Sequence, residues 1–383
     1  MATHLVATAV LAMTTTAAAV AAATGAAAAC ATCQFVPRIT PLHYVAYELD
    51  EHVDGPIDVD GRLDERAWQR VAWSAPFTDI KYGDARPPRF ETRFKMRWSA
   101  RRGVFYAAAL LVETQVWANV TKDDEVVFHD NDVELFVDPA GDCRFYKEFE
   151  LNARAVKWSL ALDRPYIDGG SPHPFALGAK FERGVHIEGG ALNDPRAGAA
   201  RYWTAELALP FDAYVRNTSA PQRAPRHGEH WRMNWSRVEW RVRVVDGAYY
   251  QKVPDTPEDN WVWQRQYAVN MHLPERWGYV VWSSDAVNAT RWAGDPQLPV
   301  RTALAHTYYG QAAYFAVNGK YTAHVDELPL PAFVLDGSLG TAPPKIAFDA
   351  MSPYAYTATV ASTGAAGVVG TVDHQRHIVV GGP

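Results

Sequence analysis

Short segments in which apolar and polar residues alternate recur from Asp58 to Ser283, and this pattern constrains the fold more than any other feature. Glycine, proline and Asp-Gly pairs punctuate these segments, and no long amphipathic helix interrupts them. Alternation at period two predicts half-buried β-strands. We therefore predict an all-β fold, an antiparallel β-sandwich of the jelly-roll type. Its strands are expected at residues 94–99, 104–112, 133–137, 148–152, 156–162, 202–209, 232–245 and 279–283.

The composition changes after Trp292, and this change divides the chain. All fourteen tryptophans lie between Trp68 and Trp292, within the predicted sandwich. Beyond them, Leu304, Tyr308 and Phe315 share one helical face, and a glycine follows as a C-cap. We expect a signal peptide, an N-terminal leader, the β-sandwich and a small C-terminal α+β extension, at residues 1–29, 30–52, 53–290 and 291–383 respectively.

The N-terminal segment predicts the destination of the protein. Residues 5–29 are apolar, uncharged and end in a run of small residues, which is typical of a secretory signal with cleavage near Ala29. A basic region before the apolar run is missing, so targeting to an organelle or membrane anchoring by residues 5–29 stays open. We expect a secreted or extracellular protein that does not contact a membrane after cleavage.

The charge of the chain argues against one class of partner. A formal net charge of −6 provides no clustered positive surface for phosphate groups. We therefore expect no nucleic acid partner. The sequence does not indicate an oligomeric state.

An acidic segment from Asp130 to Asp138 is the first candidate site. Alternation places Asp130, Asp132, Glu134 and Asp138 on one face of a strand. Flexible rows of carboxylates suit Ca²⁺, so Asp130, Asp132 and Asp138 could hold a structural Ca²⁺ ion. We expect that the protein requires no cofactor. Glu134 could accept hydrogen bonds from ligand hydroxyls. A solvated acidic face is the alternative.

Paired glutamates raise an enzymatic alternative. Glu148 and Glu150 share one face of the next strand. Glycoside hydrolysis needs two carboxyl groups roughly 5–10 Å apart across the scissile bond. Together with Glu206, they are the candidates for a polysaccharide-active hydrolase or its accessory subunit.

A tryptophan pair is the third candidate site. Trp261 and Trp263 point the same way from an extended chain, and Asn270 follows nearby. Such an arrangement could form an apolar platform edged by hydrogen-bonding groups. The alternative is that both indoles are wedges in the core.

Four motifs in order resemble the family 9 carbohydrate-binding modules, most closely the secreted proteins that consist of such a module alone. They are Ile57–Trp68, Asp130–Glu134, Trp203–Pro210 and Pro274–Gly278, and the resemblance covers roughly residues 53–285. It implies a β-sandwich that binds cellulose, xylan or related glycans, usually with structural Ca²⁺.

The resemblance also implies which residues would contact a sugar. In such modules two tryptophans sandwich a terminal sugar, one six residues before the glutamate of the acidic strand and one just before the closing Pro-x-x-aromatic-Gly. Phe128 and Met271 occupy those places here, and Glu134 keeps the glutamate. Glu150 stands where these modules carry an arginine.

The strand at 231–244 offers one more candidate. Arg237 shares a face with Glu239, Arg241 and Arg243, which is typical of a solvated, salt-bridged face. The guanidinium fork of Arg237 also suits vicinal hydroxyls or a uronate carboxylate.

The sequence thus predicts a secreted, non-catalytic protein that binds polysaccharide or oligosaccharide of the cellulose and xylan class, through aromatic packing and hydrogen bonds. The hydrolase is one alternative. A haem-binding electron-transfer sandwich is another, since Met271 lies beside His272, although neighbours on a strand point to opposite faces.

Overall fold

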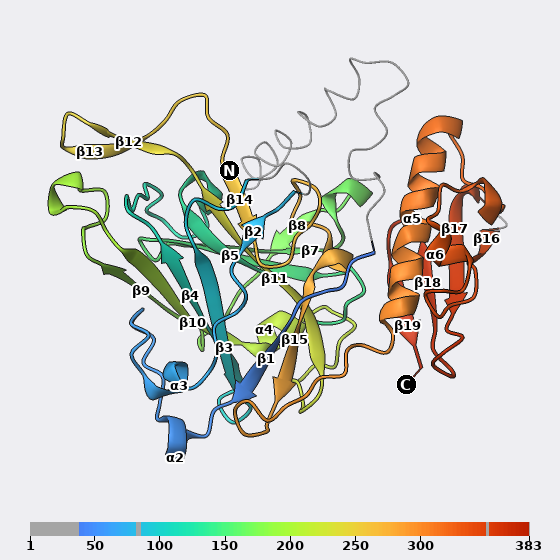
Figure 1. The fold of residues 1–383 in the computed structure, drawn as a ribbon, viewed down its shortest axis with the longest axis horizontal. Coiled ribbons are helices and arrows are strands. Elements are labelled where there is room, and N and C mark those ends of the chain that lie inside the picture. Colours follow the sequence, from blue (N-terminus) through green and yellow to red (C-terminus); the bar gives the residue numbers. More distant parts are fainter. Residues whose placement is uncertain (1–37, 82–85, 350–351, 383) are drawn as a thin grey trace. The chain divides into compact units, whose positions relative to one another are not determined.

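The computed structural model describes residues 38–81, 86–349 and 352–382. The chain divides into two compact units, Thr40–Gly294 and a second one that includes everything from Asp295 onwards (Figure 1). The expected signal peptide lies outside the described residues. None of the described helices is long and apolar enough to cross a membrane.

The first unit is built on one large sheet of thirteen strands. They are β1 (His43–Glu48), β2 (Thr78–Asp79), β3 (Thr92–Ser99), β4 (Val104–Val112), β5 (Asp132–Asp138), β6 (Tyr146–Asn152), β7 (Lys157–Leu162), β8 (Pro172–Pro174), β9 (Glu182–Glu188), β10 (Tyr202–Pro210), β11 (His230–Glu239), β14 (Asp259–Val262) and β15 (Gly278–Ser283). Their order is β8-β7-β6-β5-β11-β15-β1-β3-β4-β10-β9, and β14 pairs with both β11 and β2.

The pairing confirms the predicted sandwich and adds one parallel strand. Most neighbours are antiparallel, among them β3 with β4 and β5 with β6. β1 is the exception, because it runs parallel to both β15 and β3. It therefore joins the two halves of the sheet, and alternation within one segment cannot reveal such a partner choice.

The two halves of the sheet enclose the main core. Apolar residues of β3, β4 and β10 face those of β5, β11 and β15, with Phe94, Leu135 and Trp282 fully buried. The Phe94 and Trp235 rings stack with centroids 4.9 Å apart. Large aromatic side chains thus fill the interior.

A smaller core lies on the other face of β5 and β6. Phe136 and Tyr146 pack there with Met271 and Trp277. Polar side chains of the same strands share this face, so both faces of β5 and β6 are buried.

Short elements connect the strands of the first unit. β12 (Val242–Val245) and β13 (Tyr249–Lys252) form a separate hairpin directly after β11 (Figure 1). The helices are α2 (Glu51–Asp54), α3 (Arg66–Gln69), α4 (Phe211–Val215) and the 3-10 turns η1 (Val127–His129), η2 (Tyr166–Asp168), η3 (Pro195–Ala197) and η4 (Pro274–Arg276).

The second unit has the predicted α+β character. Helix α5 (Leu298–Asn318) packs against the sheet β16-β17-β18-β19 and ends at Gly319, which adopts φ 65° as its C-cap. The expected C-cap is thus found, although the helix is longer than its apolar face indicated. The remaining elements are η5 (Val325–Glu327), α6 (Ala332–Leu335), β16 (Lys345–Asp349), β17 (Ser352–Ala361), β18 (Val369–Asp373) and β19 (Ile378–Gly381).

Candidate functional site

A cleft of about 280 Å³ lies where β11 ends and the β12–β13 hairpin begins. The chain before β3 and the chain after β4 form its other sides. Its lining combines two aromatic rings with carboxylate, amide and guanidinium groups, contributed by Arg89, Phe90, Glu113, Gln115, Glu239, Trp240, Arg241, Val242 and Val253. We call this the β11 cleft.

Trp240 is a fixed wall of the β11 cleft. Its indole N–H donates to the carbonyl of Phe128 at 2.9 Å, and its backbone N–H donates to Asn131 Oδ1 at 2.7 Å. The ammonium of Lys252, on β13, lies 3.2 Å from the centroid of the indole. The ring is half-buried, so it is held in place and still borders the cleft.

The acidic floor of the cleft depends on a buried arginine. Arg237 has no exposed surface, and its Nη2 lies 2.9 Å from Glu113 and 2.8 Å from Glu239. Its Nη1 donates to the hydroxyl of Thr92 and to the carbonyl of Val112. Burial raises the pKa of Glu239 well above its ordinary value, and Arg237 opposes that rise.

Arg237 is therefore a positioning residue beneath the cleft and not an exposed ligand contact. The expected salt bridge is present between Arg237 and Glu239, but the expected solvation is wrong for both, whose exposed fractions are 0% and 2%. Arg241 and Arg243 are exposed, as a solvated face requires. The difference arises because β11 ends at Glu239 and the hairpin beyond it leaves the sheet.

The expected tryptophan platform is not formed. Trp261 and Trp263 are each 2% exposed and lie in the main core. The indole of Trp261 packs under the guanidinium of Arg237, 5.2 Å from its Cζ. Asn270 is half-buried and accepts a hydrogen bond from the backbone of His272, which shapes a local turn.

The residues implied by the family resemblance gather on the other face of β5 and β6. Glu134 lies on β5 directly opposite Glu150 on β6. The backbone N–H of Phe128 donates to Glu150 Oε2 at 3.0 Å, and Met271 packs in the smaller core. Phe128 connects this group to the cleft, because its carbonyl accepts the indole N–H of Trp240.

The three aspartates that were expected to bind one Ca²⁺ ion do not converge on a common position. Asp130 accepts hydrogen bonds from the backbone of Asn119 and Val120, and Asp138 accepts them from Gly141 and Cys143. Both carboxylates therefore fix loops, at opposite ends of β5. Asp132 instead lies beside Glu134 and Glu150.

The other candidates do not line the β11 cleft. The ring of His272 packs on Phe136 and Tyr146, which belong to the same smaller core as Met271, and its Nδ1 lies 3.1 Å from the hydroxyl of Tyr146. Burial lowers the pKa of His272 to about 3, so this ring stays neutral near pH 7. Glu148 and Glu150 are 5% and 1% exposed and lie outside the β11 cleft.

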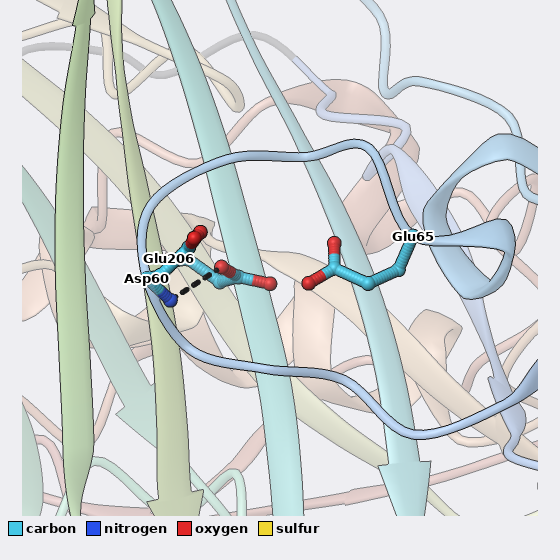
Figure 2. A group of neighbouring side chains, drawn as sticks. All are labelled: Asp60, Glu65 and Glu206. Carbon is cyan, nitrogen blue, oxygen red and sulfur yellow. Dashed lines mark hydrogen bonds between the residues drawn. The ribbon is translucent and has the colours of Figure 1, made fainter.

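Glu206 anchors the loop that precedes α3. It accepts hydrogen bonds from the Trp68 indole at 2.7 Å and from the backbone N–H groups of Gly61 and Asp60 at 3.0 and 3.2 Å. Figure 2 shows Glu65 reaching toward the same carboxyl group. The Ile57–Trp68 and Trp203–Pro210 motifs are thus joined by a structural contact.

The pH dependence of stability tests this role of Glu206. Burial raises its pKa from 4.5 to about 8, so the folded protein binds this proton more tightly than the unfolded chain does. Its contribution to stability is therefore complete below about pH 4.5 and is lost as the pH rises to about 8. Glu206→Gln should therefore reduce the loss of stability between about pH 5 and about pH 8. The melting temperatures of the variant and the wild type at these two pH values measure this difference.

Replacement of the exposed Glu182 by Gln is the matched control for Glu206→Gln. It removes a carboxyl group that lies on β9, beside β10, but is exposed to solvent. Parallel pH profiles for the wild type and Glu206→Gln would contradict the account of Glu206.

Sequence reasoning missed most of the β11 cleft. Phe90, Glu113 and Gln115 lie just outside predicted strands, where alternation carries no information about direction. Glu239 and Trp240 stood inside one predicted strand and on opposite faces of it. The sequence carries no signal for the end of β11, because alternation continues to Val244 although the strand ends at Glu239.

Comparisons with known proteins give weak likenesses. No protein-family model matches the chain, and no curated protein matches it. A Bacteroides uniformis protein proposed to bind carbohydrate is 16% identical, with a TM-score of 0.45, over 64% of this chain and 100% of that one. A family 9 carbohydrate-binding module from Caldicellulosiruptor kristjanssonii, solved with glucose, is 13% identical, with a TM-score of 0.38, over 65% of this chain and 100% of the module.

The same module solved with cellotriose is 12% identical to this chain. Its TM-score is 0.38, and the match covers 66% of this chain and 100% of the module. At these TM-scores the likenesses define no equivalent residues, so the roles of the cleft residues rest on the contacts within this chain.

Proposed function

We propose that this protein binds glycans in the β11 cleft. The observation that carries the proposal is the placement of Phe90 and Trp240 around the carboxylates of Glu113 and Glu239 in one cleft. A sugar ring presents an apolar C–H face and a rim of hydroxyls. Aromatic rings can cover the first while carboxylate and amide groups bind the second.

The polar groups of the cleft are arranged before any ligand arrives. Arg237 holds Glu113 and Glu239 at 2.9 and 2.8 Å, and the backbone N–H of Gln115 donates to Glu113 at 3.0 Å. Groups that are already ordered lose little conformational entropy when they bind. A preorganised floor of acceptors therefore favours selective recognition of hydroxyl groups.

The size of the cleft suits a short stretch of glycan. Its volume of about 280 Å³ is near the lower end of small-molecule sites, which span roughly 300–1,000 Å³. We propose one or two sugar units of a β-1,4-linked chain of the cellulose or xylan class. Their hydroxyls are equatorial, which leaves the flat faces apolar for Phe90 and Trp240.

Affinity electrophoresis of the full chain tests the proposal. Native gels would contain a soluble cellulose derivative, xylan, a β-1,3-glucan or starch. We expect retardation by the cellulose derivative or xylan. Gln115→Ala should weaken it about 3- to 10-fold, because one hydrogen bond contributes roughly 0.5–1.5 kcal/mol.

Gln69→Ala is the matched control, because Gln69 is exposed and lies outside the cleft. Absence of retardation by every glycan would contradict glycan binding. Retardation that Gln115→Ala leaves unchanged would contradict its placement in the β11 cleft. Release of reducing sugar from the same glycans would instead favour the hydrolase alternative.

A further inference from the structure

Four carboxyl groups meet on the face of β5 and β6 that lies away from the main core. Asp132 and Glu134 come from β5, and Glu148 and Glu150 come from β6. The strand register places Glu134 opposite Glu150, so their side chains emerge on the same face. The four residues are 0%, 6%, 5% and 1% exposed, in that order. We call them the carboxylate cluster.

The carboxylate cluster receives few hydrogen bonds. Val238 donates its backbone N–H to Asp132 Oδ1 at 3.1 Å, and Phe128 donates to Glu150 Oε2 at 3.0 Å. Asp132 Oδ2 and Glu148 Oε2 are buried and have no hydrogen-bond partner. Within the described ranges, no lysine, arginine or histidine forms an ion pair with any of the four.

Other buried carboxylates of the same unit have a cation or several N–H donors as partners. Asp54 lies 2.5 Å from the guanidinium of Arg97, and Glu113 pairs with Arg237. Glu206 accepts three N–H groups. An unpaired buried charge costs several kcal/mol, so a fold that pairs these carboxylates leaves the cluster as a site that needs a cation or protons.

Burial and mutual repulsion both disfavour negative charge on the carboxylate cluster. Burial is the main cause that raises the pKa of all four groups, and it raises that of Glu134 to about 7. The neighbouring carboxylates add to the rise for Asp132, Glu148 and Glu150.

We propose that Asp132, Glu134 and Glu150 bind a divalent cation, and that this cation is Ca²⁺. One oxygen from each of the three lies within 4.8 Å of the others. Oxygens on opposite sides of Ca²⁺ are about 4.6–5.2 Å apart, since its Ca–O distances are about 2.3–2.6 Å. Glu148 offers a further oxygen on the same face, and Ca²⁺ accepts several carboxylates in flexible geometry.

The ligand set differs from the one expected from the sequence and reaches the wall of the cleft. Only Asp132 is shared with the expected aspartates. Glu150 accepts the N–H of Phe128, whose carbonyl holds the Trp240 indole. A cation in the cluster would therefore brace Trp240, although cation binding itself does not depend on the proposed glycan function.

Calcium titration of the chelator-treated full chain tests the proposal. We expect saturable binding with one Ca²⁺ per chain, measured by calorimetry, and a higher melting temperature in Ca²⁺ than in EDTA. Glu150→Gln keeps the shape of the side chain and removes its charge. The substitution should lower the affinity for Ca²⁺ at least about tenfold, because this affinity depends on the number of charged ligands.

The melting temperature in EDTA shows whether the Glu150→Gln variant folds, so that loss of Ca²⁺ binding can be distinguished from misfolding. There Glu150→Gln should be at least as stable as the wild type, because glutamine is neutral and keeps the shape of a side chain whose negative charge is disfavoured by burial. Glu65→Gln, in the separate Asp60, Glu65 and Glu206 group, is the matched control and should bind Ca²⁺ normally.

Three results would overturn the proposal. They are no Ca²⁺-dependent change in the wild type, unaltered Ca²⁺ binding by Glu150→Gln, and loss of binding in Glu65→Gln alone. Because the readouts use Ca²⁺ without glycan, failure of glycan binding would leave this result unaffected.

Discussion

Arg237→Met should lower the free energy of unfolding by roughly 3–5 kcal/mol, the range seen when one partner of a buried ion pair is removed. Arg237 is fully buried, and its guanidinium neutralises both Glu113 and Glu239. Methionine retains the apolar stem and provides no charge. Glu113 would then remain buried without a cation, and Glu239 would keep only its longer contact of 3.7 Å to Arg89, which is the source of the loss. Denaturant unfolding measures it.

Two variants control the interpretation of Arg237→Met. Arg101→Ala removes an exposed partner of Glu51 and should leave the free energy of unfolding close to that of the wild type. Replacing Glu113 and Glu239 by glutamine in the Arg237→Met background should recover much of the stability, because no buried charge then remains. A loss under about 1 kcal/mol for Arg237→Met would contradict the positioning role.

Trp240→Ala should weaken glycan binding about 30-fold, equivalent to about 2 kcal/mol, as is typical when an aromatic anchor is removed from a binding site. The indole borders the cleft and is fixed by its hydrogen bond to Phe128 and by Lys252. Alanine removes the wall on which a sugar face would pack. Titration calorimetry with the glycan found by electrophoresis measures the change.

Trp292→Ala is the matched control for Trp240→Ala. Trp292 is also half-buried, but it packs on His43 and Tyr279, outside the cleft. It should retain wild-type affinity. Equal losses of glycan affinity in the two variants would indicate a general effect on folding. Wild-type affinity of Trp240→Ala would contradict the proposal that Trp240 contacts the glycan.

The strands could be predicted from the sequence because their signal is local. β4 begins and ends where alternation placed it, at Val104 and Val112. The face of a side chain also follows from alternation, so Trp261 and Trp263 were correctly placed on one side. Alternation does not say which side is core, and this is why their expected exposure was wrong.

The site could not be predicted in full because its partners are distant in the chain. Arg237 pairs with Glu113, 124 residues earlier, and only the fold brings the two together. Asp132, Glu134 and Glu150 were each singled out from the sequence, yet their convergence depends on the register of β5 with β6. Local patterns select residue types, whereas strand pairing selects neighbours.

Hydrogen exchange of the full chain, with and without the bound glycan, tests the central claim most directly. If the glycan occupies the β11 cleft, backbone amides at 89–92, 113–116 and 239–253 should exchange more slowly in its presence. The same segments should show no change in Trp240→Ala at equal glycan concentration. Protection confined to segments that do not line the cleft would contradict the assignment of this cleft as the glycan site.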